Sequence, residues 1–239
     1  MPKDLLAAPI KPAHGAHYLG FLARMHRHIW PDWYLQIGTN EGRSLAMAPG
    51  KSVAVDPRFV ISEDVIRGKP QVHFYQLTSD DFFAQAPFKA IVDRFDMFFL
   101  DGMHRFEFLL RDFMSSEELA KPDSIIVMHD CVPMSYAAAE RSPRPDLTPS
   151  WVGDVWKLVP ILKEYRPDLT IDIVDCQPSG LTIVTGLDAE NTTLSQKYAE
   201  IKERYFEMTL SDFGESRLGD LLQMQSAGSK AIARFVGDT

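Results

Sequence analysis

Residues 34–44 read Tyr34-Leu35-Gln36-Ile37-Gly38-Thr39-Asn40-Glu41-Gly42-Arg43-Ser44, and the fold can be inferred outward from this stretch. Its apolar beginning predicts a buried strand that turns sharply through glycine into the start of a helix. Gly38 allows a positive φ and a close approach of the backbone to a ligand, and Gly42 lets the following helix pack close to the strand. This layout is typical of a nucleotide-binding loop, although a plain glycine turn between a core strand and a helix would look the same in isolation.

The spacing of the two glycines bears on the kind of nucleotide. A dinucleotide-binding loop needs the pattern Gly-x-Gly-x-x-Gly, so that the backbone can approach the pyrophosphate. Thr39 and Asn40 fill the turn here, and the middle glycine is missing. The spacing therefore counts against an oxidoreductase with a dinucleotide cofactor.

A carboxylate follows the second predicted strand. Residues 52–55 are a short, mostly apolar run that ends at Asp56. In nucleotide-binding α/β folds an acid at the end of such a strand accepts hydrogen bonds from both hydroxyls of a ribose. The alternative is an aspartate that caps a helix or a turn.

Polar residues also follow the third and fourth predicted strands. A polar loop with a helix N-cap comes after residues 72–75, at a place suited to adenine contacts. The apolar strand at residues 96–100 runs directly into Asp101 and His104.

The fifth predicted strand, residues 124–128, ends on His129 and Asp130. Parallel strands end at the same edge of a sheet, and ligands of open α/β sheets bind at that edge. We therefore expect the polar residues after the strands to lie at one site.

The alternation of elements predicts an α/β fold. Five strands alternate with helices, and two more, at residues 169–174 and 181–185, are close enough in sequence to form an antiparallel hairpin. We expect a doubly wound, Rossmann-like, mostly parallel sheet of seven strands with an antiparallel terminal hairpin, plus C-terminal helices. Helices are predicted at residues 20–30, 106–119, 152–165, 193–206 and 217–235. Residues 131–150 contain four prolines and are predicted to form a lid or acceptor loop.

Composition narrows the classes of partner. The chain has 239 residues, 45% of them hydrophobic and 24% charged, with a net charge of -8. A surplus of acids disfavours nucleic acid and anionic membranes as partners. No long apolar run is present, so we expect a cytoplasmic protein. Cys131 and Cys176 have no paired spacing and are expected to be buried, unpaired side chains.

With these residues in place, the chain resembles class I S-adenosylmethionine-dependent methyltransferases, in particular the group of the macrocin and mycinamicin O-methyltransferases, which modify sugars. The resemblance spans residues 33–185. The opening stretch looks like the first motif of the family, and Val55-Asp56 is similar to its ribose-binding acid. Phe99-Leu100-Asp101-Gly102-Met103-His104, followed by Arg111-Asp112-Phe113, resembles the Asp-Gly-x-His signature.

The resemblance implies S-adenosylmethionine as the cofactor and O-methylation of a small hydroxylated acceptor, such as a sugar or a glycoside. It also implies three parts: an N-terminal helical extension (residues 1–32), the methyltransferase domain (33–186), and a helical tail (187–239) that belongs to the same domain or forms the contact of a homo-oligomer. The residues expected to bind the cofactor are Gly38, Thr39, Asn40, Arg43, Asp56, Ser79 and Asp101.

The chain departs from the family at two positions. The family usually has an acid where Gln36 stands, which places in question a contact with the amino end of the cofactor. Metal-dependent relatives have Glu-Asp at the end of the fifth strand, where this chain has His129 and Asp130. Gln36 is the main support for an alternative function, a non-catalytic module that binds a nucleoside or a protein partner.

Methyl transfer to an alcohol needs a base or a metal, because an alcohol is a poor nucleophile at neutral pH. His104 is predicted to be the general base, since histidine titrates near ~6.5, and His129 is the competing base. Asp101 and Asp130 are predicted to bind a divalent cation such as Mg²⁺, with His129 as a further ligand. In the alternative, Asp101 contacts only the cofactor and Asp130 caps a turn.

Overall fold

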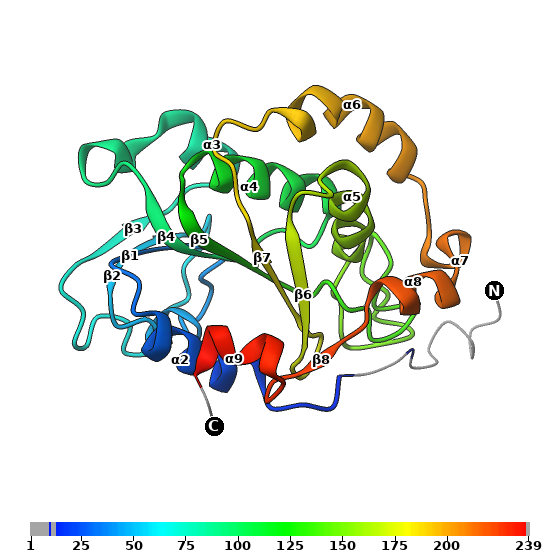
Figure 1. The fold of residues 1–239 in the computed structure, drawn as a ribbon, viewed down its shortest axis with the longest axis horizontal. Coiled ribbons are helices and arrows are strands. Elements are labelled where there is room, and N and C mark those ends of the chain that lie inside the picture. The colour runs from blue at the N-terminus through cyan, green and yellow to red at the C-terminus, as the bar shows by residue number, and fades with distance from the viewer. Residues whose placement is uncertain (1–9, 11–12, 238–239) are drawn as a thin grey trace.

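The computed structural model describes residues 10 and 13–237, which form one eight-stranded sheet between helices (Figure 1). The remaining residues of the predicted N-terminal extension and the last two of the predicted tail lie outside the described residues. The strand order is β3-β2-β1-β4-β5-β7-β6-β8. The strands are β1 (Trp33–Ile37), β2 (Lys51–Val55), β3 (Val72–Tyr75), β4 (Phe95–Leu100), β5 (Ala120–His129), β6 (Thr170–Asp175), β7 (Leu181–Thr185) and β8 (Gln225–Ser226).

The first five strands are parallel, and the central ones end level with one another. Ile37 of β1 pairs with Val55 of β2 on one side and with Leu100 of β4 on the other. Leu100 in turn pairs with Met128 of β5. The residues that follow these strands therefore lie side by side. They lie at the switch point of the sheet, where the chain continues from β1 to β2 on one side and later to β4 on the other side.

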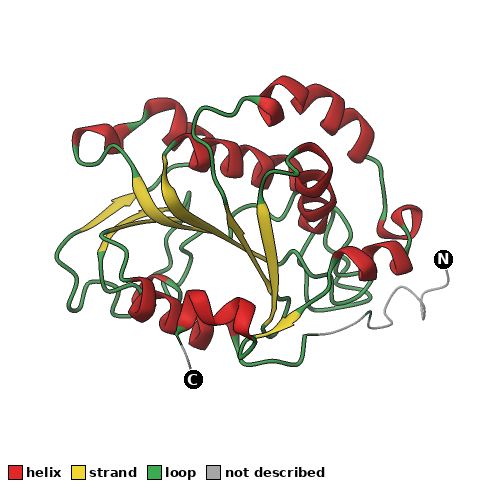
Figure 2. Cartoon of the chain, viewed as in Figure 1, coloured by secondary structure: helices red, strands yellow, loops and turns green. Residues whose placement is uncertain are grey.

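Helices cover both faces of the sheet because each face is apolar (Figure 2). On one face α2 (Tyr18–Ile29) and α9 (Lys230–Val236) lie side by side and bury residues such as Phe21 and Phe235. The other face is covered by helices that bury residues such as Phe82, Phe113 and Ile201. The helices of this second face are α3 (Ser79–Gln85), α4 (Phe106–Glu118), α5 (Leu158–Tyr165) and α6 (Thr193–Tyr205).

The predicted α/β class, the doubly wound parallel sheet and the antiparallel hairpin are confirmed. β6 and β7 pair antiparallel, with Val174 opposite Leu181, and β7 pairs antiparallel with β5. The predicted helix at residues 152–165 begins as the 3-10 helix η3 (Val155–Lys157) and continues as α5. Pro160 stands in the first turn of α5, where a missing N–H costs no helical hydrogen bond.

The prediction of an α-helix directly after the first glycine turn was wrong. Between β1 and β2, all of whose connecting residues are described, the chain forms turns and only the short 3-10 helix η1 (Leu45–Met47). Pro49 and Gly50 follow at once, which leaves no length for a helix and a return to β2. Gly42 has a φ of 87°, and a Cβ there would lie 2.4 Å from Val65 Cγ1. The absence of a side chain at Gly42 therefore leaves room for Val65, and not for the close packing of a helix as predicted.

The predicted helix at residues 217–235 is also corrected. It is divided into α8 (Glu215–Leu221) and α9, with β8 between them, and α7 (Leu210–Phe213) precedes both. β8 pairs in parallel with β6, and the Gln225 side chain donates to Asp172 at 2.9 Å. These contacts add an eighth strand to the seven that were predicted.

Cys131 and Cys176 are free and buried, as predicted.

Within residues 10 and 13–237, every helix is too short or too polar to cross a bilayer.

Candidate functional site

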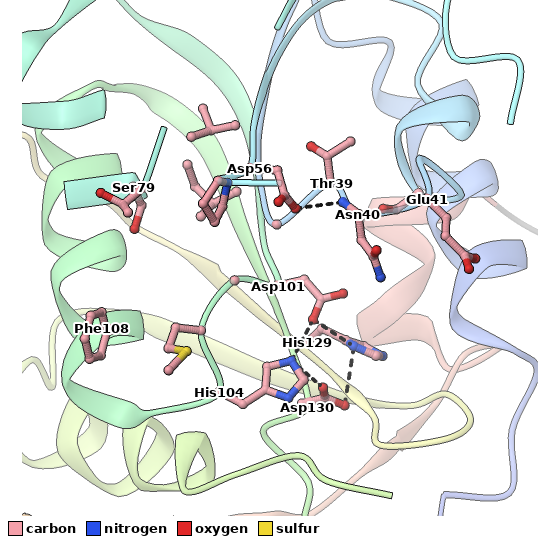
Figure 3. A pocket seen from close by; sticks show the side chains of 18 of the residues that line it. Thr39, Asn40, Glu41, Asp56, Ser79, Asp101, His104, Phe108, His129 and Asp130 are labelled. Atoms are coloured by element: carbon pink, nitrogen blue, oxygen red, sulfur yellow. Dashed lines mark hydrogen bonds and ion pairs between the residues drawn. The ribbon is translucent and has the colours of Figure 1, made fainter. Parts of the chain in front are cut away.

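A cavity of about 740 Å³ opens at the carboxyl edge of the sheet (Figure 3). Its walls come from the ends of β1, β2, β4 and β5, from the start of α3 and from Tyr18 at the start of α2. Every residue that was predicted for the site lines this cavity. These are Gly38, Thr39, Asn40, Arg43, Asp56, Ser79, Asp101, His104, His129 and Asp130.

The turn at Gly38 joins three strands. Gly38 has a φ of 81°, its N–H donates to the Val55 carbonyl at 2.9 Å, and the Asp101 N–H donates to the Ile37 carbonyl at 2.9 Å. A Cβ on Gly38 would lie 1.9 Å from the carbonyl oxygen of Asp101. Glycine is needed here because the end of β4 passes so close to the turn.

Asp56 fastens the same turn from the second strand. One carboxylate oxygen accepts from the backbone N–H of Asn40 at 2.8 Å, and the other accepts from the N–H of Arg58 at 2.7 Å. Each carboxylate oxygen has two lone pairs, so both keep capacity for a ligand hydroxyl. The hydroxyl of Thr39 is buried and has no hydrogen-bond partner among the described residues.

Ser79 and Asp80 line the cavity at the start of α3. Thr78 caps this helix by accepting from the Asp81 N–H, as the N-cap prediction requires. Asp80 receives a two-pronged hydrogen bond from the Arg111 guanidinium, with both distances 2.7 Å. Arg111 thereby fixes one wall of the cavity to α4.

Gln36 points beneath the turn. Its amide nitrogen donates to the Gly38 carbonyl at 3.2 Å and to the Ser44 hydroxyl at 2.8 Å, and its oxygen accepts from the Tyr34 hydroxyl at 3.0 Å. The side chain is fully buried, and Gln36 is not one of the residues that line the cavity. Gln36 therefore stabilises the turn from behind the cavity wall.

Two aspartates and two histidines meet at the ends of β4 and β5 (Figure 3). His104 Nε2 lies 3.2 Å from Asp130 Oδ2 and 3.5 Å from Asp101 Oδ1. His129 Nδ1 lies 3.4 Å from an oxygen of each carboxylate. The side chains of His104 and Asp101 are 25% and 20% exposed, and those of His129 and Asp130 only 7% and 9%, so the first two face the cavity more openly.

The carboxylates hold protons on both histidines. Burial alone would lower the pKa of His104, but its hydrogen bond with Asp101 and the charges of Asp130 and Asp101 raise it to about 9. Burial likewise opposes a raised pKa at His129, yet the charges of Asp101 and Asp130 raise it to about 10. The pKa of Asp101 is below its usual range because the lowering by both histidines exceeds the effect of burial. In this arrangement both imidazoles are cations at neutral pH.

The donor atoms of Asp101, His104 and Asp130 lie within 4.8 Å of one another. His104 Nδ1 donates to the Trp151 carbonyl at 3.0 Å, which directs Nε2 toward the two carboxylates. A backbone acceptor behind the ring is typical of histidines in metal sites. This grouping contains His104 in place of His129, the histidine that was predicted as a ligand.

Four residues around this cluster were missed from the sequence: Tyr18, Trp151, Gly153 and Ser179. The Tyr18 ring lies 4.1 Å from the ring of His129. Gly153 has a φ of 66°, and a Cβ there would lie 1.8 Å from the carbonyl oxygen of His104. A signal for Gly153 was available, because a glycine inside a predicted helix, here residues 152–165, often has a packing reason.

Comparisons with known proteins agree with this geometry. Residues 35–131 match the model of a family described as a methyltransferase domain. No curated protein matches the chain. Among solved structures, the cofactor-bound protein Rv0187 from MTB aligns with a TM-score of 0.54 at 16% identity, over 78% of this chain and 86% of that one. An O-methyltransferase from Bacillus cereus in complex with SAH aligns with a TM-score of 0.50 at 17% identity, over 74% of this chain and 84% of that one.

At these identities the likeness to the solved structures concerns the fold. The matching domain spans the chain from β1 to the end of β5, and it contains all of the predicted site residues. The chain therefore contains a region that matches a methyltransferase domain, and its fold is similar to those of the two solved structures.

Proposed function

We propose that the protein transfers a methyl group from S-adenosylmethionine to a hydroxyl group of a small acceptor, such as a sugar or a glycoside. The observation that carries this proposal is a single cavity lined by two groups of residues with different chemistry. The Gly38 turn and Asp56 form one group, and the cluster of Asp101, His104 and Asp130 beside them forms the other. The sugar acceptor rests on the resemblance to the macrocin and mycinamicin group.

The cofactor is assigned to the end of the cavity near β1 and β2. S-adenosylmethionine supplies the methyl group as a sulfonium. The backbone of residues 38–40 would face its methionine part, with Thr39 and Arg43 nearby, and Asp56 would accept from the ribose hydroxyls. Ser79, which lines the cavity at the start of α3, is assigned to the adenine end.

His104 is proposed as the general base. Its Nδ1 is occupied by the Trp151 carbonyl, so Nε2 is the atom that takes up the acceptor proton. His129 is less suited, since it is more deeply buried and its Nε2 lies 3.4 Å from the Ser179 hydroxyl. A neutral His104 requires that the charge of its two carboxylate neighbours is offset.

A divalent cation such as Mg²⁺ or Mn²⁺ fits between Asp101 and Asp130. The two carboxylates are suitable ligands for such an ion, and the His104 imidazole beside them is left for the role of base. When bound, the cation supplies positive charge that offsets the carboxylates and stabilises the acceptor oxygen as it loses its proton. His129, which was predicted as a further ligand, is more deeply buried than His104, and its nitrogens are not among the three donor atoms within 4.8 Å of one another.

Gln36, on which the alternative of a non-catalytic module depends, lies beneath the turn with its polar atoms hydrogen bonded. A calorimetric titration with S-adenosylmethionine and with NAD(H) tests the proposal. We expect binding of the former only, followed by methyl transfer in a screen of glycosides and nucleotide sugars. Binding of NAD(H) alone would support an oxidoreductase instead, and binding of S-adenosylmethionine without transfer to any acceptor class would favour a binding module.

A further inference from the structure

The hairpin between β6 and β7 places a serine directly behind the acidic cluster. Ser179 is fully buried, and its hydroxyl donates a short hydrogen bond to Asp130 Oδ1. The same hydroxyl oxygen lies 3.4 Å from His129 Nε2. Because a hydroxyl has one proton and two lone pairs, it can donate to Asp130 and accept from His129 at the same time.

The two oxygens of Asp130 therefore have different environments. Oδ1 is held from behind by Ser179 and lies 3.4 Å from His129 Nδ1. Oδ2 lies 3.2 Å from His104 Nε2 and belongs to the side of the carboxylate that faces the cavity. Asp130 also has a φ of 62°, a left-handed conformation that aspartate seldom adopts. The orientation of this carboxylate thus depends on partners outside its own strand.

The backbone around Ser179 is itself well fixed. The Val132 N–H donates to the Ser179 carbonyl at 3.1 Å, and the Gly180 N–H donates to the Cys176 carbonyl at 2.8 Å. A Cβ on Gly180 would lie 2.5 Å from Val132 Cγ2, so the hairpin is packed tightly against the segment after Asp130. The hydroxyl therefore has little freedom to move away from the carboxylate.

We propose that Ser179 is a positioning residue, which orients Asp130 so that Oδ2 is presented to His104 and to a divalent cation. It does not touch the acceptor or the cofactor, and it acts through the carboxylate. The inference deepens the proposed function and rests on it. Outer partners of metal ligands typically change metal affinity by ~10–100-fold when they are removed.

The test measures binding of Mn²⁺ to the full-length protein, saturated with S-adenosylhomocysteine, by the loss of the free-ion signal in electron paramagnetic resonance. We expect Ser179→Ala to weaken Mn²⁺ binding by ~10–100-fold and to leave S-adenosylhomocysteine binding unchanged. Ser179→Cys keeps the shape of the side chain with a slightly larger atom and replaces the hydroxyl with a weak donor, and it should show the same loss. It also serves as the working variant if Ser179→Ala does not fold.

Thr182→Val is the matched control, since it removes a buried hydroxyl from β7 of the same hairpin while keeping its shape. It should bind Mn²⁺ like the parent protein. Parent-like Mn²⁺ affinity in both Ser179 variants, or an equal loss in Thr182→Val, would overturn the inference. A parent protein that binds S-adenosylhomocysteine but not Mn²⁺ would also overturn it, whereas a parent that fails to bind S-adenosylhomocysteine would contradict the proposed function itself.

Discussion

At the scale of single residues, the site depends on side chains that serve the fold and the ligand together. Asp56 accepts two backbone N–H groups and so shapes the turn after β1, while it also borders the cavity. Gly38 admits the end of β4 and also leaves the backbone open to a ligand. Variants at these positions therefore need a control for folding as well as for binding.

The first prediction concerns Asp56. Asp56→Ala should weaken S-adenosylmethionine binding by ~1–3 kcal/mol, because ribose hydroxyls would be left without their acceptor. Calorimetry measures this change, and circular dichroism checks that the fold is kept. Asp32→Ala, at an exposed acid before β1, is the control and should bind like the parent. Equal affinity in the two variants would refute the ribose assignment.

The second prediction concerns His104. His104→Ala should lower kcat by ~10²–10⁴ while cofactor affinity holds, because a positioned base contributes about that factor. Exposed His28 provides the control, and His28→Ala should turn over like the parent. If His129→Ala alone lost activity, the base would have to be moved to the end of β5. If His104→Ala abolished Mn²⁺ binding, His104 would be a ligand and not a base.

The third prediction concerns metal removal. Exhaustive treatment with EDTA should suppress turnover, and added Mg²⁺ or Mn²⁺ should restore it, because His104 can act as a neutral base only when a metal cation offsets the charge of the two carboxylates. Cofactor binding, measured on the same sample, should survive the treatment. Full activity in the presence of chelator would leave Asp101 and Asp130 with cofactor or structural roles only.

Residues at strand ends were predictable from the sequence, and those that approach from elsewhere were not. Asp101 and Asp130 follow apolar strands, and the alternating pattern indicates that such strands are parallel neighbours. Trp151 and Ser179 reach the cluster from segments whose position depends on tertiary packing. Their local sequence carries no periodic signal that would identify this contact.

At the scale of elements, α4 shows where an amphipathic pattern misleads. The apolar positions predicted the face that packs on the sheet, and the charged residues were expected on the other face. Glu107 and Asp112 are nevertheless buried, because Glu107 pairs with Arg141 and Asp112 lies near Gly102, below the loop after β4. Charged residues of a helix can be buried when an ion-pair partner or a neighbouring loop covers them.

The fourth prediction uses this buried acid. Burial raises the pKa of Asp112 to about 7, although a hydrogen bond with Ser79 acts in the opposite direction. A folded-state pKa above the unfolded value of 3.8 means that the folded protein binds more protons between these two pH values. The contribution of Asp112 to stability is therefore fully present below about pH 4 and is lost as the pH rises to 7.

Asp112→Asn removes the ionisable group, and with it the loss of stability at high pH. The variant should therefore be more stable than the parent by on the order of 3–4 kcal/mol at pH 8 and by much less at pH 4. Thermal unfolding at both pH values measures the difference. Asp220→Asn, at an exposed acid of α8, should show no such dependence. An equal effect of Asp112→Asn at the two pH values would contradict a raised pKa.

At the scale of the whole molecule, the class of sheet was predictable and its edges were not. Apolar strands that alternate with helices indicate a parallel sheet, and the handedness of crossovers places the ends of these strands together. The tail adds β8 through a two-residue pairing that is too short to give a sequence pattern. The space beside Gly42, where a helix after β1 was expected to pack, is occupied by the Val65 side chain from the connection between β2 and β3. That contact between distant segments could not be predicted from the local sequence.

The proline-rich segment, residues 131–150, was predicted to be a lid or acceptor loop, and in the structure it is firmly attached to the body of the protein. Arg141 donates to Glu107 on α4 and to Asp154, which follows the segment, at 2.9 and 3.2 Å. Asp154 accepts in addition from the Phe106 N–H at 2.9 Å and from Lys157 at 2.8 Å. This charged network joins the segment to the helix layer next to His104.

The last prediction tests this attachment. Arg141→Met should lower the free energy of unfolding by ~3 kcal/mol, at the lower end for a broken buried pair, because Glu107 would remain buried without its cation while Lys157 still compensates Asp154. The Arg141 side chain is 25% exposed, which places the loss at that lower end. Arg144→Met is the matched control, since Arg144 pairs with the exposed Asp146 on the same segment and should change the free energy by less than ~1 kcal/mol. Urea unfolding of both variants gives the comparison. A loss of the same size in the two would mean that the segment is held by its apolar contacts, and that the charges of Glu107 and Asp154 are solvated when the partner is removed.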